Sequence, residues 1–370
     1  MKKALFLCIL FSISLRAQAY RPIPRYFSDI LLGRTTSAAS EALGKSFFNF
    51  EANPFSFKTN PAMVSEGRSA AAGYSYSLPY LFDNFSNGSY YNYIGVQASL
   101  GPIGGFGFGR YYLKQYEDLV RTVEHPEGTG EKYTVDSYVY TLAYSREVMD
   151  GLFAGISANY MRQNFWNDNF ENASLGFGVV KIVNIKEGPG FSHFLGISLS
   201  IENLIEIYQH NNYKPALIDL DPEADSPINS AVYNFPDVVL PQRLNAGASY
   251  NGKVDIFSAK MQIEYRDVIN SGYFTEVSQS LELGVYDAIF LRGGNYSYNA
   301  FTEDFDSKFT YGFGIKLGKS VLGEKFPLTL SFDYARLKFE DYLYPYHRDE
   351  YKDKKYDIYS AGLRYSFKKN

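Results

Sequence analysis

The sequence contains a single cysteine, Cys8, among 370 residues. Disulfide bonds therefore cannot hold this fold together. It also lacks any apolar run of about 18 residues, the length that a membrane-spanning helix needs, which excludes a helical membrane protein. Lys and Arg number 36 against 40 Asp and Glu, and the formal net charge is −4. Without a basic excess, we expect no nucleic-acid partner.

The first residues are typical of a secretory signal peptide. Lys2 and Lys3 form a basic start, residues 4–15 are apolar, and Ala17-Gln18-Ala19 is a small-x-small cleavage site. We predict that residues 1–19 are removed and that the mature chain begins at Tyr20. Cys8 lies inside the removed segment, so the predicted mature chain has no cysteine.

Aromatic residues are abundant, at 18% of the chain, with 34 Tyr and 30 Phe beside 31 Gly. Apolar and polar residues alternate with period 2 through most of the sequence after residue 68, which indicates β-strands. The range 308–318 is the clearest case. One face carries Phe309, Tyr311, Phe313 and Ile315, and the other carries Lys, Thr and Gly.

The alternation predicts fourteen strands. They are centred on residues 69–78, 91–100, 103–115, 132–147, 152–165, 171–182, 192–204, 241–250, 255–267, 274–285, 287–298, 308–318, 325–336 and 356–367. A soluble sandwich or propeller also alternates, but no tandem repeat of about 40–50 residues supports a propeller. An apolar face against a face of Gly, Ser, Thr and paired charges favours an all-β, antiparallel transmembrane barrel over residues 69–367.

The lengths of the predicted connections give independent support. Short links alternate with mostly longer ones, such as 116–131, 205–240 and 337–355, and the link near 167–169 is a short exception. Outer-membrane barrels combine short periplasmic turns with longer extracellular loops. The alternation therefore predicts an integral protein of a Gram-negative outer membrane, surrounded by outer-membrane lipid, with both chain ends on the periplasmic side.

The last predicted strand resembles the β-signal that the barrel-assembly machinery reads in outer-membrane proteins. The pattern is polar, any, Gly, any, any, apolar, any, aromatic, and Gly362, Tyr365 and Phe367 occupy its defining positions. The resemblance implies that this machinery is a partner during biogenesis. Lys368-Lys369-Asn370 follow the motif, so the aromatic residue is not the last one.

Residues 20–68 precede the strands and do not alternate, although 28–32 and 37–43 can form short helices. A barrel of fourteen strands is wide enough to leave a lumen, so we predict that this segment is a plug. Asn60 and Pro61 form a fixed turn in this reading, because proline restricts both its own φ and the residue before it.

Two sequence motifs resemble the FadL and PorV/PorQ superfamily of outer-membrane barrels. The first is Gly44 with Asn60-Pro61-Ala62 just before the first strand, and the second is the stretch 240–250. The resemblance implies fourteen strands and an N-terminal plug, with Gly44, Asn60, Pro61 and Ala62 as the plug or entry motif. Leu43-Gly44-Lys45 departs from the family's usual Gly-Gly or Met-Gly pair.

The predicted lumen face carries charges of both signs, which argues against a strongly ion-selective pore. These residues are Lys260, Glu264, Arg266, Lys308, Lys316, Asp333 and Arg364. The four histidines show no metal-ligand spacing, and Ser192-His193 would point to opposite faces of a strand. We therefore expect no enzyme, catalytic site, metal or cofactor.

Two functions remain open. Resemblance to FadL implies passive transport of hydrophobic small molecules across the outer membrane. Resemblance to PorV and PorQ implies a component of a type IX secretion system that docks secreted cargo or partner proteins, with the long loop 205–240 as the docking element.

Overall fold

A computed structural model gives the fold of the chain. It describes residues 35–47, 53–65, 67–77, 90–119, 125, 127–165, 168–188, 190–211, 216–219, 230–233, 240–269, 274–300, 306–323, 325–338 and 355–367. The predicted signal peptide and the possible helix at 28–32 lie outside these residues.

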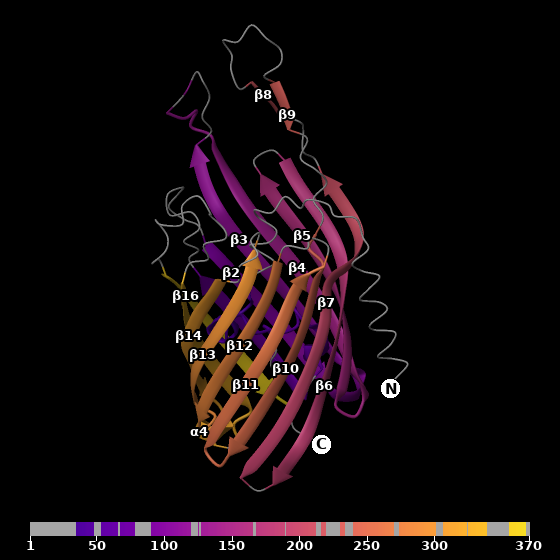
Figure 1. The fold of residues 1–370 in the computed structure, drawn as a ribbon, viewed down its shortest axis with the longest axis vertical. Coiled ribbons are helices and arrows are strands. Elements are labelled where there is room, and N and C mark those ends of the chain that lie inside the picture. The colour runs from indigo at the N-terminus through magenta and orange to yellow at the C-terminus, as the bar shows by residue number, and fades with distance from the viewer. Residues whose placement is uncertain are drawn as a thin grey trace.

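Fourteen antiparallel strands form one closed barrel, as predicted (Figure 1). Each strand pairs with its neighbours in the barrel, and β1 pairs with β16 to close it. The strands are β1 (Arg68–Ser77), β2 (Tyr90–Leu100), β3 (Gly105–Leu119), β4 (Lys132–Met149), β5 (Leu152–Phe165), β6 (Asp168–Gly188), β7 (Phe191–Asn211), β10 (Arg243–Val254), β11 (Phe257–Val268), β12 (Phe274–Val285), β13 (Ile289–Ala300), β14 (Asp306–Leu317), β15 (Leu328–Lys338) and β16 (Lys355–Ser366).

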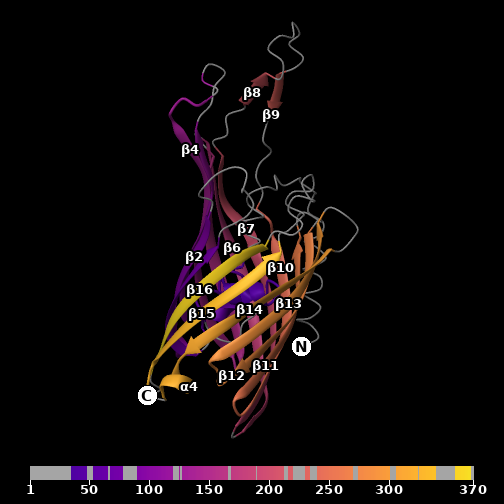
Figure 2. The same ribbon diagram turned by 90° about the vertical axis from the view of Figure 1, so that its left-hand side faces the viewer.

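The two ends of the barrel differ in their connections. At one end, which we call the short-turn end, neighbouring strands are joined by a few residues, by the 3₁₀ helix η3 (Gly101–Ile103) or by the short helix α4 (Lys319–Leu322). At the other, the loop end, β7 and β10 are joined through a small hairpin of β8 (Ala216–Asp219) and β9 (Ser230–Tyr233). Figure 2 shows α4 and the β8–β9 hairpin at opposite ends of the molecule.

The strands alternate between an outer and an inner face. On β14 the side chains of Phe309, Tyr311 and Phe313 are 73%, 52% and 47% exposed on the outer face, while Thr310 between them is buried. β1 shows the same alternation, with Ser69, Ala71 and Ser75 buried. The period-2 pattern therefore assigns the two faces of these strands correctly.

β6 and β7 are longer than their predicted ranges of 171–182 and 192–204, since each has 21 residues. Their pairing shifts register between Leu175 and Phe177 and again between Asn184 and Lys186. Such bulges break the alternation, which is why the sequence pattern ended these strands too early. The β8–β9 hairpin was not predicted.

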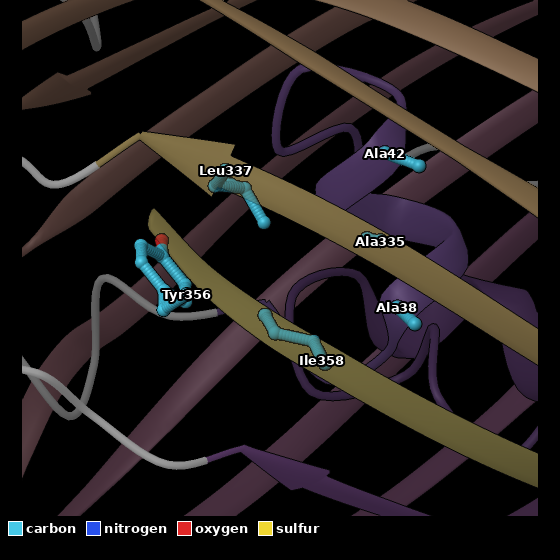
Figure 3. Packing of buried hydrophobic residues seen from close by; sticks show 6 residues of the cluster. All are labelled: Ala38, Ala42, Ala335, Leu337, Tyr356 and Ile358. Carbon is cyan, nitrogen blue, oxygen red and sulfur yellow. The ribbon is translucent and has the colours of Figure 1, made fainter. Parts of the chain in front are cut away.

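Inside the barrel lies a stretch that we call the inner segment, residues 35–47 and 53–65. It contains the helix α3 (Ala38–Ala42), within the predicted helical range 37–43, and the 3₁₀ helix η1 (Pro61–Val64). Ala38 and Ala42 pack against Ala335, Leu337 and Ile358 of β15 and β16 (Figure 3). Among the described residues, no helix is long and apolar enough to cross a lipid bilayer.

Candidate functional site in the barrel interior

Inward-facing glycines make room for the inner segment. A Cβ added at Gly155 would lie 2.6 Å from the backbone nitrogen of Ala62, and one at Gly105 would lie 2.5 Å from the carbonyl oxygen of Val64. A side chain at either position would collide with backbone, so only glycine permits this approach. An added Cβ would also meet segment backbone at Gly95 and Gly294, and it would meet segment side chains at Gly73, Gly178 and Gly312.

Wall side chains hold the inner segment by its backbone. Tyr91 donates its hydroxyl to the carbonyl oxygen of Thr35 at 2.9 Å, and Tyr93 donates to that of Pro54 at 2.6 Å. Ser99 and Ser200 donate in the same way to Ser65 and Thr59, at 2.9 and 2.8 Å. Buried carbonyl groups need such partners, so these bonds fix the segment at defined heights in the barrel.

Asn60 is fully buried and begins η1, with Pro61 in its first turn. Its φ of −133° and ψ of 104° are extended, as expected for a residue before proline. Its side-chain oxygen accepts from the backbone N–H of Ala62 at 3.0 Å, while its Nδ2 donates to Ser198 Oγ at 2.7 Å. The Asn60-Pro61-Ala62 motif is therefore both a turn and an anchor to β7.

Gly44 lies in a left-handed turn against β13 and β14. Its φ is +66°, and that of Lys45 is +61°, a conformation that costs a residue with a side chain about 1–2 kcal/mol. Thr310 fixes the turn, because its Oγ1 accepts from Gly44 N–H at 2.9 Å and donates to the carbonyl oxygen of Ala42 at 3.0 Å.

Lys45, whose backbone is in the left-handed conformation, lies among buried charged side chains. The Lys45 ammonium lies 3.8 Å from Glu276, and Arg266 contacts the same carboxylate at 3.2 Å. Arg266 also donates to the carbonyl oxygen of Lys45 at 3.2 Å and to Asn245 Oδ1 at 3.2 Å. Burying a charge is costly unless an opposite charge lies close to it, and Glu276 lies beside two cations in this network.

Glu264 extends the network to the end of the first half of the inner segment. It accepts from the hydroxyl of Ser46 and, at 2.9 Å, from the backbone N–H of Phe47. Arg266 also lies over the ring of Phe47, 5.4 Å from its centroid. Segment and wall thus form one connected polar cluster on this side of the barrel.

Lys58 is a buried cation of the inner segment, and its ammonium lies 4.6 Å from the centre of the Tyr111 ring. Burial lowers the pKa of Lys58 to about 8 from the usual 10.5. The nearby Glu202 carboxylate opposes this shift in pKa, whereas Arg243 and Arg266 add to it.

Near the loop end, the inner face carries a group of buried aromatic and apolar side chains. We call these buried residues the aromatic layer: Tyr91, Tyr111, Leu113, Tyr296, Tyr298, Leu337, Tyr356 and Ile358. The rings of Tyr91 and Tyr111 lie 5.5 Å apart, and those of Tyr296 and Tyr298 stack at 5.8 Å. These rings lie beside the buried charges, because Tyr298 pairs directly with Glu276 across β12 and β13 and the Lys45 ammonium lies 4.4 Å from the centre of the Tyr296 ring.

The aromatic layer was not predicted, because the aromatic residues of the strands were assigned to the outer face alone. Consecutive aromatic residues in the sequence indicate inward-facing rings. Tyr90-Tyr91 and Tyr111-Tyr112 are consecutive aromatic pairs, and neighbouring residues of a strand point to opposite faces. Such pairs place one ring on each side of the wall.

The predicted lumen-facing residues fall into separate groups on the inner face. Glu264 and Arg266 belong to the buried network, whereas Lys260, Lys316, Asp333 and Arg364 line a cavity near the short-turn end. Lys308 is half-buried on β14 near the loop end. The structure therefore does not bring these charges together as a single ring.

The motif residues of the last strand lie beside the first. Gly362 pairs with Gly73 of β1 and Ser331 of β15. Tyr365 and Phe367 are 42% and 39% exposed on the outer face, and their rings meet edge to face at 5.5 Å.

His193 of β7 has a partner on the neighbouring strand β10. Its Nδ1 lies 2.6 Å from the hydroxyl of Tyr250 on the outer face. Within the ranges that the structure describes, no group of three or more His, Cys, Asp or Glu side chains could hold a metal ion.

No protein-family model and no curated protein matches the sequence. Among solved structures, a Pseudomonas aeruginosa FadL homologue is similar at 13% identity and a TM-score of 0.44, covering 90% of this chain and 99% of that one. The CymD monoaromatic hydrocarbon channel is similar at 10% identity and a TM-score of 0.44, covering 91% and 99%. The P. putida toluene transporter TodX is similar at 10% identity and a TM-score of 0.43, covering 91% and 100%.

Proposed function

We propose that this protein is a barrel of the Gram-negative outer membrane that carries small hydrophobic molecules passively across it, with the inner segment as its plug. The observation that carries the proposal is the aromatic layer. Water-filled barrels have a polar interior, whereas here buried rings such as Tyr296 and Tyr298 line the inner face near the loop end. A surface of this kind suits an apolar solute.

The outer face supports the membrane location. Large apolar side chains are exposed there on many strands, including Ile156 at 59%, Leu291 at 62% and Phe309 at 73%. An apolar outer band on a closed barrel leaves no unpaired strand edge in lipid. The short-turn end then faces the periplasm, and the loop end faces the outside.

The inner segment supports the plug. It lies against both halves of the wall, from β14–β16 at Ala38 and Ala42 to β5 and β6 at Ala62 and Met63. A path through the barrel therefore requires the segment to move or a gap beside it to open.

Uptake by cells tests the transport proposal. Cells that produce the protein receive radiolabelled toluene, octanoate or, as a polar control, glucose, and cells with an empty vector give the background. We expect faster entry of at least one hydrophobic probe and unchanged entry of glucose. Equally faster entry of glucose would indicate an open aqueous pore. Unchanged entry of both toluene and octanoate would contradict transport of these two kinds of hydrophobic molecule.

A disulfide tests the plug. Ala38 N–H donates to Ser360 Oγ at 3.2 Å, so the pair Ala38→Cys and Ser360→Cys joins α3 to β16 over a short distance. The predicted mature chain has no other cysteine to react. We expect the oxidised variant to lose uptake and dithiothreitol to restore it, whereas Ala38→Cys alone is unaffected. Full uptake by the oxidised variant would contradict a movable plug.

The docking alternative has less support. It depends on the loop 205–240, of which the structure describes the end of β7, the β8–β9 hairpin and Leu240. No observation on the described residues favours a secreted-protein partner at this loop.

A further inference from the structure

An open cavity lies beneath the inner segment, toward the short-turn end. Its volume is about 150 Å³. The segment contributes Ser37, Ser40 and Asn53 to its lining. The wall contributes the short-turn halves of β10 to β16 and β1. The cavity is therefore bounded by the inner segment on one side and by the barrel wall on the other.

The wall of this cavity is rich in positive charge. Four cationic side chains line it, Lys260, Arg292, Lys316 and Arg364, against two acidic ones, Glu282 and Asp333. Arg292 contacts both acids, at 2.5 Å to Glu282 and 2.6 Å to Asp333. Arg292, Glu282 and Asp333 together have a net charge of −1. Lys260, Lys316 and Arg364 add three positive charges, so the net charge of the lining is +2.

A cleft lined by an excess of one sign of charge concentrates counter-ions, because its low-dielectric walls focus the field. Lys and Arg side chains are the usual protein ligands of carboxylates and phosphates. The segment side adds hydroxyl and amide groups, which are able to donate hydrogen bonds to such oxygens. The lining thus matches an oxyanion in charge and in hydrogen-bonding capacity.

We propose that this cavity binds a small oxyanion, a carboxylate or a phosphate, between Lys260, Lys316 and Arg364 of the wall and the polar side chains of the inner segment. Because both surfaces take part, the bound anion links the segment to the wall and stabilises its seated position. This inference goes beyond the proposed transport, since it requires only the cavity and its charges.

The oxyanion has two possible sources, a free ion of the periplasm or the head group of an amphiphile. Leu43, Phe55 and Phe290 also line the cavity and offer apolar surface to an alkyl tail. Inorganic phosphate and hexyl phosphate share the head group and differ in the tail. Equal affinities would identify a free ion, and tighter binding of hexyl phosphate would identify an amphiphile.

Calorimetric titration of the purified full-length protein with both probes, in a non-ionic detergent at low ionic strength, tests the site. Lys316→Met removes one cation, and we expect it to weaken binding about tenfold, as for the loss of one charge-assisted bond. Lys308→Met is the matched control, because Lys308 lies on the same strand but not on the cavity. It should leave the affinity unchanged.

A second variant moves the affinity in the opposite direction. Asp333→Asn removes an acid and raises the excess to three positive charges, so we expect tighter binding, with Arg292 still held by Glu282. Absence of binding by both probes would overturn the proposal. Equal losses of affinity in Lys316→Met and Lys308→Met would also overturn it. A loss of affinity in Asp333→Asn, if its melting temperature is unchanged, would do the same. None of these results depends on uptake, so they are distinct from a failure of the transport proposal.

Protection of the inner segment gives a second readout. If the anion links segment and wall, phosphate should slow proteolysis within residues 35–65 in the unmodified protein and not in Lys316→Met. Binding without any change in proteolysis would overturn the link to the segment.

Discussion

Asn60 and Ser198 are 138 residues apart in the chain and are joined by a hydrogen bond of 2.7 Å. The same Asn60 side chain also caps η1 through Ala62 N–H. One amide group therefore starts the helix and attaches it to β7. This double use explains why an Asn-Pro pair stands at the point where the inner segment turns towards the wall.

Asn60→Ala should lower the free energy of unfolding of the inner segment by about 1–2 kcal/mol, since it removes a cap and leaves buried partners unsatisfied. Ser198→Ala removes only the tie to β7 and should cost less. Proteolysis rates within residues 53–65 measure both effects. Equal costs for the two variants would contradict the double role of Asn60.

Gly178→Ala should loosen the inner segment, because the added Cβ would overlap the side-chain oxygen of Asn60. Overpacking of this kind costs about 1–3 kcal/mol. Gly293→Ala is the matched control on another strand, since its Cβ would have no neighbour closer than 4.0 Å. Melting temperatures in detergent check the pair, and a similar fall for both variants would refute a specific fit at Gly178.

Arg266→Met should be strongly destabilising, by about 3–5 kcal/mol, because it leaves the buried Glu276 carboxylate without its closest cation. The double variant Arg266→Met with Glu276→Gln removes the unpaired charge as well, and we expect it to regain part of the loss. Unfolding by denaturant measures both. A double variant no more stable than Arg266→Met would show that the charge of Glu276 is not the cause.

Lys58 should make the stability of the folded protein depend on pH. The pKa of Lys58 is about 8 in the folded protein and 10.5 when unperturbed. Between these two values the unfolded state binds more protons, so stability should rise with pH there and should not change through this group below about pH 8.

The Lys58 prediction is checked by the difference between the unmodified protein and Lys58→Met in unfolding free energy at pH 7 to 10. The unmodified protein should gain stability relative to the variant above pH 8. Lys319→Met, in the exposed helix α4, serves as a control and should follow the unmodified protein. A constant difference between the unmodified protein and Lys58→Met across this range would contradict the lowered pKa.

Phe313→Arg tests the outer face. Phe313 is 47% exposed there, in the middle of β14. A cation facing the middle of a bilayer costs a barrel about 2–4 kcal/mol. We expect poor assembly in membranes for Phe313→Arg and normal assembly for Phe313→Leu, measured by heat-modifiable migration on gels. Normal assembly of Phe313→Arg would place this residue outside the hydrocarbon.

The barrel could be predicted from the sequence because its strands obey one simple rule. Period-2 alternation fixes which residues of β14 face outward, and the lengths of the connections indicate which ends of the strands meet. The rule failed at the ends of β6 and β7, because their pairing shifts register between Asn184 and Lys186 of β6 and, on β7, opposite Gly176. Bulges depend on pairing with a neighbouring strand, and a single strand's sequence does not show them.

The interior could be predicted less well. The purpose of Gly105 and Gly107 in β3 depends on Val64 and Phe57, which approach from a distant part of the chain. The charges of Lys316 and Arg364 were assigned to the inner face, but their excess around one cavity required the three-dimensional arrangement. Long-range juxtaposition, rather than local preference, decides these features.

The pairing of β1 with β16 has a consequence for the order of synthesis. Ser69 pairs with Ser366, so the wall closes only after nearly the whole chain has been made. Such distant contacts slow folding and leave both terminal strands with open edges in the meantime. Because residues 35–65 directly precede β1 and end up enclosed, the nascent chain has to keep them unburied and protected from aggregation until the last strand arrives.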